Sequence, residues 1–190
     1  MEVCSSPNTA VDGAEDHVPC LIPAQKLAER VQELAQEVSA EYSGKPLLVV
    51  GVLHGAYVFM ADLVRHLTIP VRCGFMMVSS YGDDTVTSGR VKLQLDLTQP
   101  VEGEHLLLVD DIVDTGVSIA WLVDYLTKKK PASVRLCVLL DKPARRRVPV
   151  KIDYVGFEIP DRFVVGYGID CAGRHRELPY VGYVPTDEQS

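Results

Sequence analysis

Short, largely apolar runs recur along the chain, and a turn and a helical pattern follow two of them. The first run covers residues 47–53, and comparable runs cover 71–78, 106–109 and 134–140. Apolar runs of this length are typical of strands that are covered on both faces of a sheet. Strands that alternate with helices form right-handed βαβ units. We therefore predict an α/β fold with a mostly parallel, twisted sheet flanked by helices.

Other segments of the chain show apolar residues at helical spacing. Within residues 23–42, apolar side chains recur every three or four positions, and Glu, Gln and Lys stand between them; they are Leu27, Val31, Leu34 and Val38. This pattern predicts an amphipathic helix with one face on the core. We expect further helices over 57–67 and 118–127, and a strand of alternating character over 91–95.

The length of 190 residues suits one ordinary domain. We expect a flexible N-terminal leader over residues 1–19 and a single domain over 20–190. The formal net charge of −7 argues against a general binder of nucleic acid or of anionic membranes, because such proteins need a positive surface. We accordingly expect no nucleic-acid or membrane partner, and we interpret the basic runs at 128–130 and 145–147 as solvated surface.

Targeting signals are absent from the sequence. The first twenty residues have no apolar core of signal-peptide length, and no later run approaches the ~20 apolar residues needed to cross a bilayer. The five cysteines are widely spaced, without a Cys-x-x-Cys motif or a Cys/His cluster. We therefore expect free thiols of a reducing compartment rather than a zinc site, and a cytoplasmic protein.

Residues 106–118, LLLVDDIVDTGVS, carry the most chemical information. Asp110 and Asp111 follow a buried strand, and Asp114 precedes a turn that enters a helix. That turn presents free N–H groups and the positive end of a helix dipole, which suits a phosphate group; its residues are Thr115, Gly116, Val117 and Ser118. Carboxylates beside the turn can accept hydrogen bonds from sugar hydroxyls. The segment predicts a ribose-phosphate site beyond the carboxyl ends of the strands.

This segment closely resembles the phosphoribosyl-pyrophosphate signature of type I phosphoribosyltransferases. Residues 140–143 (LDKP) and 155–170 (VGFEIPDRFVVGYGID) resemble the hypoxanthine-guanine branch of that family, and matching segments extend over about 49–184. The resemblance implies the type I fold with a small hood subdomain and a flexible loop, Mg²⁺ as cofactor, and a homodimer or homotetramer. It also implies purine salvage, in which the 5-phosphoribosyl group passes from phosphoribosyl pyrophosphate to hypoxanthine or guanine, giving IMP or GMP plus pyrophosphate.

The resemblance assigns roles around the ribose and its phosphate. Asp110 and Asp111 match the acids that bind the ribose 2′- and 3′-hydroxyls, and residues 115–118 match the loop around the 5′-phosphate. Asp114 matches the carboxylate next to purine N7, which acts as general base or stabilises the protonated base. A positioned carboxylate there suits the chemistry, because the attacking purine nitrogen must lose a proton.

Further roles follow for the purine and the metal. Lys142 matches the lysine that contacts the exocyclic oxygen of a 6-oxopurine; an ammonium group has only donors, so it would not suit the N6 amine of adenine. Phe163 matches the aromatic residue that stacks on the purine, and the Val164 backbone matches the contact to the far edge of the base. Asp170 matches a contact to purine and magnesium, with Asp110 and Asp111 completing the expected metal ligands.

Pyrophosphate contacts are expected from a loop after the first long strand and from Arg176. The loop reads Leu53, His54, Gly55, and the resemblance implies a cis peptide between the first two. His54 replaces the usual basic residue, and a histidine is only partly charged near neutral pH. Ser80 and Tyr81 match the tip of a flexible loop that closes over the reacting groups and excludes water.

Two alternatives stay open. One is a non-catalytic regulator that senses phosphoribosyl pyrophosphate, which the acidic charge and the full set of purine and magnesium residues disfavour. The other is xanthine as an additional substrate. The sequence does not rank hypoxanthine, guanine and xanthine, and it does not decide between dimer and tetramer. The role of residues 1–19 and the effect of His54 on pyrophosphate binding are equally open.

Overall fold

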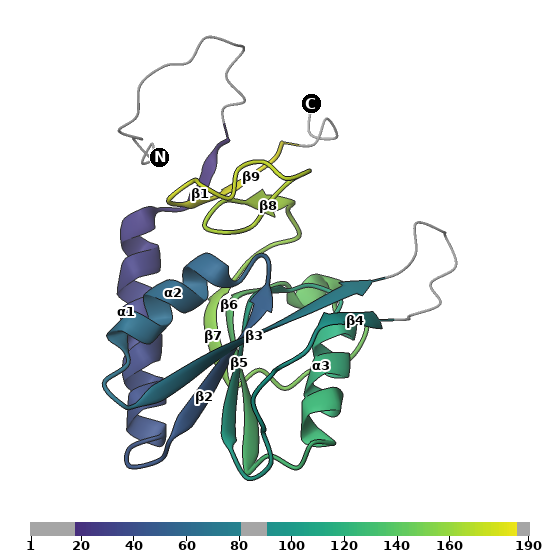
Figure 1. Ribbon diagram of the computed structural model, residues 1–190. Helices are drawn as coiled ribbons and strands as arrows, with labels where there is room; N and C mark the ends of the chain where they lie inside the picture. The colour runs from purple at the N-terminus through teal and green to yellow at the C-terminus, as the bar shows by residue number, and fades with distance from the viewer. Residues whose placement is uncertain (1–17, 81–90, 186–190) are drawn as a thin grey trace.

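Six strands form one sheet, namely β2 (Leu47–Leu53), β3 (Val71–Ser80), β4 (Val91–Leu95), β5 (His105–Val113), β6 (Ser133–Asp141) and β7 (Tyr154–Glu158). The computed structural model describes residues 18–80 and 91–185. The strand order is β4-β3-β2-β5-β6-β7 (Figure 1). All neighbours run parallel except β3 and β4, which are antiparallel. The mostly parallel α/β sheet predicted from the sequence is therefore confirmed.

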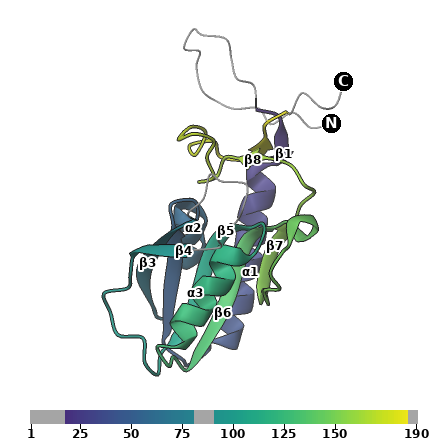
Figure 2. The ribbon, with the colours of Figure 1, turned by 90° about the vertical axis from the view of Figure 1, so that its right-hand side faces the viewer.

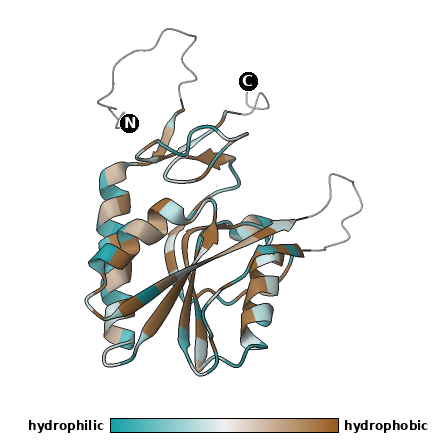
Figure 3. Cartoon of the chain, in the orientation of Figure 1, coloured by the Kyte–Doolittle hydropathy of each residue, from teal (hydrophilic) through white to brown (hydrophobic). Residues whose placement is uncertain are grey.

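Three helices flank this sheet, namely α1 (Ala24–Glu41), α2 (Tyr57–His66) and α3 (Val117–Thr127). α1 and α2 pack on one face, and α3 packs on the other (Figure 2). In β2, Leu47 and Val49 join the core under α1 and α2, whereas Leu48 and Val50 join the core under α3. Successive strand residues point to opposite faces, so both sets are apolar and the central strands are brown along their length in Figure 3.

A second, three-stranded sheet lies above the first in Figure 1 and corresponds to the hood subdomain that the resemblance implies. Its strands, in spatial order, are β1 (Cys20–Ile22), β9 (Val181–Tyr183) and β8 (Val164–Val165). Ile22, Val164 and Val181 are buried in the same core as α1. The Tyr180 hydroxyl donates to the Val18 carbonyl at 3.1 Å, so the hood joins the two ends of the described chain.

The strand order reverses between β2 and β5. β2 leads through α2 to β3 on one side, and β5 leads through α3 to β6 on the other. In open α/β sheets, ligands bind beyond the carboxyl ends of the strands at such a switch point. The loops that follow Leu53 and Val113 meet there, which places both sequence-predicted phosphate loops at one edge of the sheet.

β5 is longer than the apolar pattern predicts. We expected the strand to end at Val109, with a loop beginning at Asp110, but the pairing with β6 continues to Val113 opposite Asp141. The reason is that polar side chains interrupt an apolar run without interrupting the backbone ladder. Asp110 and Asp111 therefore belong to the strand and share its rigidity.

The cysteines only partly follow the expectation. Cys73, Cys137 and Cys171 carry free thiols. Cys20 is disulfide-bonded, so the prediction of free thiols throughout is wrong for this residue, because spacing along a sequence does not reveal which cysteines lie close in space. None of the helices described in residues 18–80 and 91–185 is long and apolar enough to span a bilayer.

Candidate active site

Asp110 and Asp111 stand at the switch point, near the carboxyl end of β5. Asp110 Oδ1 accepts a hydrogen bond from the Asp111 N–H at 3.0 Å, and Asp111 Oδ1 accepts one from the Ile112 N–H at 2.9 Å. Burial raises the pKa of Asp110 well above its ordinary value, and the adjacent Asp111 carboxylate raises it further. Burial also raises the pKa of Asp111, against the lowering effect of its hydrogen bonds and of the Arg176 charge. Two such neighbouring acids would gain from a ligand that supplies positive charge or donors.

The loop after β2 lies directly against Asp111. The peptide between Leu53 and His54 is cis, as the resemblance implies. A Cβ placed on Gly55 would lie 1.7 Å from Asp111 Oδ2, so a side chain at this position would have to displace the Asp111 carboxylate or the loop. A Cβ placed on Gly168 would in turn lie 2.3 Å from the Gly55 carbonyl oxygen. The predicted pyrophosphate loop, a predicted ribose acid and a hood loop are thus in contact.

Arg176 holds the hood loop in place. Its Nη1 donates to the Gly168 carbonyl at 2.7 Å, and its Nη2 pairs with Asp170 Oδ1 at 2.7 Å. Asp170 Oδ2 accepts a hydrogen bond from the Gly173 N–H at 2.8 Å. The sequence predicts Arg176 as a pyrophosphate contact; the structure adds that it fixes Asp170 and the backbone that faces Gly55.

The turn before α3 has the geometry of an anion site. Gly116 has φ 83° and stands at the N-cap of α3, where no side chain caps the helix. A Cβ at this position would lie 2.6 Å from the Val148 carbonyl oxygen, so glycine is required for both reasons. The Thr115 carbonyl accepts hydrogen bonds from the backbone N–H groups of Arg147 and Val148 at 2.9 and 3.0 Å, which anchors the turn. The Val117 N–H donates to the Thr115 hydroxyl at 3.5 Å, a long hydrogen bond that a phosphate could replace, so the start of α3 suits an anion.

The predicted purine residues gather around the ends of β5 and β6 and on the hood. Lys142 is buried, and its N–H donates to the Val113 carbonyl at 3.0 Å, which joins the two strand ends. Asp114 Oδ1 is shielded from solvent and makes no hydrogen bond. Phe163 is 51% exposed beside the buried Val164, so its ring face is open to a stacking partner.

Comparison with known families places residues 21–171 in the phosphoribosyl transferase domain. The chain belongs to this family. The hypoxanthine phosphoribosyltransferase of Haemophilus influenzae is 46% identical over 175 residues, which cover 90% of this chain and 98% of that protein. The hypoxanthine-guanine phosphoribosyltransferase of Bacillus subtilis is 46% identical over 162 residues, 85% of this chain and 90% of that protein. The predicted resemblance, and with it the class of enzyme, is confirmed.

Two further comparisons bear on this phosphoribosyltransferase. A crystal structure of a hypoxanthine-guanine phosphoribosyltransferase from Bacillus anthracis matches with a TM-score of 0.85 and 42% sequence identity, over 89% of this chain and all of that one. The bifunctional TilS/HprT protein of Listeria innocua is 50% identical over 167 residues, and the chain spans 26% of that protein's length. The structural match confirms the type I phosphoribosyltransferase fold.

The predicted magnesium ligands of this phosphoribosyltransferase are all carboxylates. Asp110, Asp111 and Asp170 offer carboxylate oxygens, the donors that Mg²⁺ prefers. Within the described residues, no three acidic, histidine or cysteine side chains gather tightly enough to hold a metal by themselves. Mg²⁺ commonly takes only one or two carboxylates and completes its shell with water and substrate phosphates. The donors therefore fit a magnesium ion that arrives with a diphosphate substrate.

Sequence reasoning missed the arginines after Lys142. We expected residues 145–147 to be solvated surface, and the exposed side chains of Arg145 and Arg147 agree with this, whereas the Arg146 side chain is only 18% exposed. Arg146 donates to the Asp114 carbonyl at 3.1 Å and to the Val113 carbonyl at 3.3 Å, and it pairs with Asp141. Arg145 Nε lies 3.5 Å from Asp114 Oδ1. Their closeness to Lys142 in the sequence was the one available signal.

The expected flexible loop falls mostly outside the described residues. Ser80 is the last residue of β3 and pairs with Val91 of β4, whereas we expected the strand to end at Val78. The antiparallel partner explains the difference, because it continues the ladder past the apolar residues. Tyr81 lies outside the described part of the chain.

Proposed function

We propose that this phosphoribosyltransferase serves purine salvage by joining hypoxanthine or guanine to the ribose 5-phosphate unit of phosphoribosyl pyrophosphate. The contact between Asp111 and Gly55 carries the proposal. It brings an acid suited to ribose hydroxyls against the backbone loop suited to pyrophosphate. A sugar bound at one and a leaving group bound at the other would place the bond that breaks between them, in a fixed geometry.

The ribose-phosphate end is the better supported half of this site. The N–H groups at the start of α3, from the turn 115–118, would hold the 5′-phosphate. Asp110 and Asp111 would hold the ribose hydroxyls, and with Asp170 they would accept Mg²⁺. Bound there, Mg²⁺ would neutralise charge on the departing pyrophosphate. Arg176 and the backbone of residues 53–55 would contribute contacts to the same group.

At the purine end, each of five residues has its own role. Phe163 would stack on the base, and the Val164 backbone would contact its far edge. Lys142 would donate to the 6-oxo group, which selects oxopurines over adenine. Asp114 would take or share the proton of the attacking nitrogen, an effect worth typically ~10²–10⁴-fold in rate. Ser80, with its neighbour outside the described residues, would begin the closing loop.

Quaternary structure and location complete the proposal. We place the protein in the cytoplasm, which the free thiols of Cys73, Cys137 and Cys171 support and the disulfide at Cys20 does not. We also propose a homodimer or homotetramer, for which the exposed apolar side chains of Tyr57, Phe75 and Leu95 are candidate contacts.

The test is to supply phosphoribosyl pyrophosphate and Mg²⁺ with hypoxanthine, guanine, xanthine or adenine in separate reactions, and to follow nucleotide formation. A sample without metal and an Asp114→Asn variant run alongside. We expect turnover with hypoxanthine or guanine, none with adenine, loss of turnover without metal, and a strong reduction in the variant. Tight binding of phosphoribosyl pyrophosphate without turnover of any base would instead identify a sensor of that metabolite.

A further inference from the structure

Four charged side chains alternate in sign on the purine side of the site. Arg145 Nε lies 3.5 Å from Asp114 Oδ1, and Arg145 Nη1 lies 3.8 Å from Asp161 Oδ1. Lys142 Nζ also lies 3.8 Å from Asp161 Oδ1. The order is therefore Asp114, Arg145, Asp161, Lys142. This row of ion pairs connects Asp114 and Lys142, the two side chains expected to touch the base.

The Asp114 carboxylate is held in an unusual way. Its Oδ1 is shielded from solvent and makes no hydrogen bond. A buried acceptor without a hydrogen bond normally costs about 1–3 kcal/mol, so its position needs another source of stabilisation. The Arg145 guanidinium supplies compensating charge there, with its Nε 3.5 Å from Oδ1 of a carboxylate whose side chain is 37% exposed as a whole.

We propose that Arg145 is a positioning residue for the reaction. It orients the Asp114 carboxylate electrostatically, without a hydrogen bond that would compete with the purine proton, while Asp161 connects Arg145 to Lys142 and sets the spacing of the two base-facing groups. This inference rests on the proposed function, since it concerns the same purine pocket. When substrates displace water from the pocket, the effective dielectric constant falls and the attraction between Arg145 and Asp114 grows.

The neighbouring arginines do not fill this role. Arg146 is committed to the carbonyls of Val113 and Asp114 and to Asp141, so its guanidinium secures the backbone. Arg147 is exposed and pairs with no acid in the described residues. Arg147 therefore provides a matched control, because Arg147→Ala removes the same charge from the same loop.

The experiment compares Arg145→Ala, Arg145→Lys, Arg147→Ala and the unmodified protein, with hypoxanthine, phosphoribosyl pyrophosphate and Mg²⁺. A misplaced catalytic group lowers turnover more than binding, so we expect kcat to fall about 10-fold in Arg145→Ala, with KM for phosphoribosyl pyrophosphate within about twofold. Arg145→Lys should recover to within about threefold and Arg147→Ala to within about twofold of the unmodified kcat. Because the Arg145 side chain is 47% exposed, melting temperatures should stay close to one another.

Asp161→Asn tests the second link. We expect it to raise KM for hypoxanthine about fivefold, because Lys142 loses its counter-charge, and to change kcat less than Arg145→Ala does. An Arg145→Ala kcat within twofold of the unmodified protein, an equal loss in Arg147→Ala, or no recovery with lysine would overturn the inference while leaving the proposed function intact. Absence of turnover in the unmodified protein would overturn both.

Discussion

The Asp111 carboxylate lies against the α-carbon of Gly55, so that a Cβ at position 55 would be 1.7 Å from Oδ2 and 2.5 Å from Cγ of the acid. Gly168 approaches the same residue from the hood, within 2.3 Å of the Gly55 carbonyl when a Cβ is placed on it. Three segments distant in the sequence therefore meet where only backbone fits. The edge of the sheet, the pyrophosphate loop and the hood cannot shift independently at this point.

Gly55→Ala should nearly abolish activity. The added methyl group would displace either the Asp111 carboxylate or the loop, and a displacement of about 1 Å can cost ~10²-fold in rate. We expect kcat/KM with hypoxanthine to fall about 100-fold or more. Gly44→Ala serves as the control: Gly44 has φ 73°, but nothing lies within 4 Å of the place that an added methyl group would take, so this variant should lose stability and keep activity. Retention of more than about a tenth of the activity in Gly55→Ala would contradict the prediction.

Asp110→Asn should raise the melting temperature of the protein and weaken its binding of phosphoribosyl pyrophosphate and Mg²⁺. Burial and the Asp111 charge raise the pKa of Asp110 in the folded protein. A raised folded-state pKa contributes stability that is fully present below the unfolded pKa of about 3.9 and is lost as pH rises through the folded value. Near pH 7.5 the raised pKa of Asp110 therefore costs the free fold stability, and the asparagine variant, which cannot ionise, should melt at a higher temperature.

The measurement is thermal unfolding of the metal-free protein near pH 7.5 and near pH 4.5. The advantage of Asp110→Asn should shrink at the lower pH, where the wild-type acid is increasingly protonated. The same variant should bind phosphoribosyl pyrophosphate and Mg²⁺ less well, as expected for a site that keeps a costly charge for function. A wild-type protein that is the more stable of the two near pH 7.5 would refute the argument.

The central sheet could be predicted from the sequence for a physical reason. Strands such as β2 are covered on both faces, and a strand buried in this way must be apolar at every position. The turn at Gly116 could be predicted as well, because residues 115–118 are small or polar and stand directly before a helical pattern. Both features depend on residues that are neighbours in the sequence, and so they can be predicted without a structure.

The hood and the row of ion pairs from Asp114 to Lys142 could not be predicted in the same way. β8 has two residues and β1 and β9 have three each, too few to show an alternating pattern. The pairing of Cys20 with Gly182 joins opposite ends of the chain. Arg145 stood in a run of three arginines, and only the fold reveals that one of them faces Asp114. Contacts of this kind depend on three-dimensional placement, which residue spacing does not contain.

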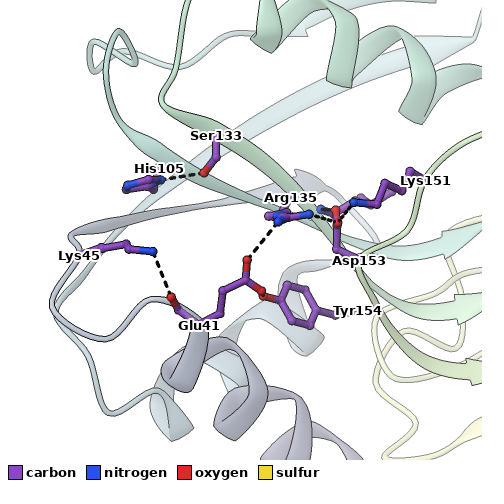
Figure 4. A network of polar contacts seen from close by, with 9 residues as sticks. Glu41, Lys45, His105, Ser133, Arg135, Lys151, Asp153 and Tyr154 are labelled. Atoms are coloured by element: carbon purple, nitrogen blue, oxygen red, sulfur yellow. Dashed lines mark hydrogen bonds and ion pairs between the residues drawn. The ribbon is translucent and has the colours of Figure 1, made fainter.

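A polar network at the other end of the sheet should contribute to stability alone. Figure 4 shows Arg135 between Glu41 and Asp153, with Asp153 also meeting Lys151. Burial pushes the pKa of Asp153 upward, but hydrogen bonds from the Leu136 N–H, Lys151 and Arg135 outweigh it and lower the pKa. A lowered folded-state pKa contributes stability that is present above the unfolded value and is lost as pH falls through the folded one.

Asp153→Asn should therefore lower the free energy of unfolding by about 1–2 kcal/mol at pH 7, as measured by urea denaturation. The difference should narrow as pH falls through the lowered folded-state pKa of Asp153. Asp124→Asn is the control, because that carboxylate is 61% exposed and pairs with Lys128 within one helix, a pair worth about 0.3–0.5 kcal/mol. Equal losses in the two variants would show that the buried network adds nothing beyond a surface ion pair.

Tyr167→Phe should affect the site as well as the fold. The Tyr167 hydroxyl donates to Asp62 of α2, and both burial and this hydrogen bond raise the pKa of the tyrosine. Tyr167 has φ 51° and stands between Gly166 and Gly168, in the hood loop that Arg176 fixes against Gly55. Removing the hydroxyl should cost about 1 kcal/mol of stability and release one tether of that loop, so KM for phosphoribosyl pyrophosphate should rise about threefold to tenfold.

Tyr154→Phe separates the two effects. The Tyr154 hydroxyl donates to Glu41, and Tyr154 begins β7 at the end of the sheet away from Asp111. Both substitutions remove a buried hydroxyl from a carboxylate, so their losses in melting temperature should be similar. Only Tyr167→Phe should weaken substrate binding. A Tyr154→Phe variant whose KM rises as far would show that general loosening of the fold, rather than the link between hood and α2, governs the pyrophosphate site.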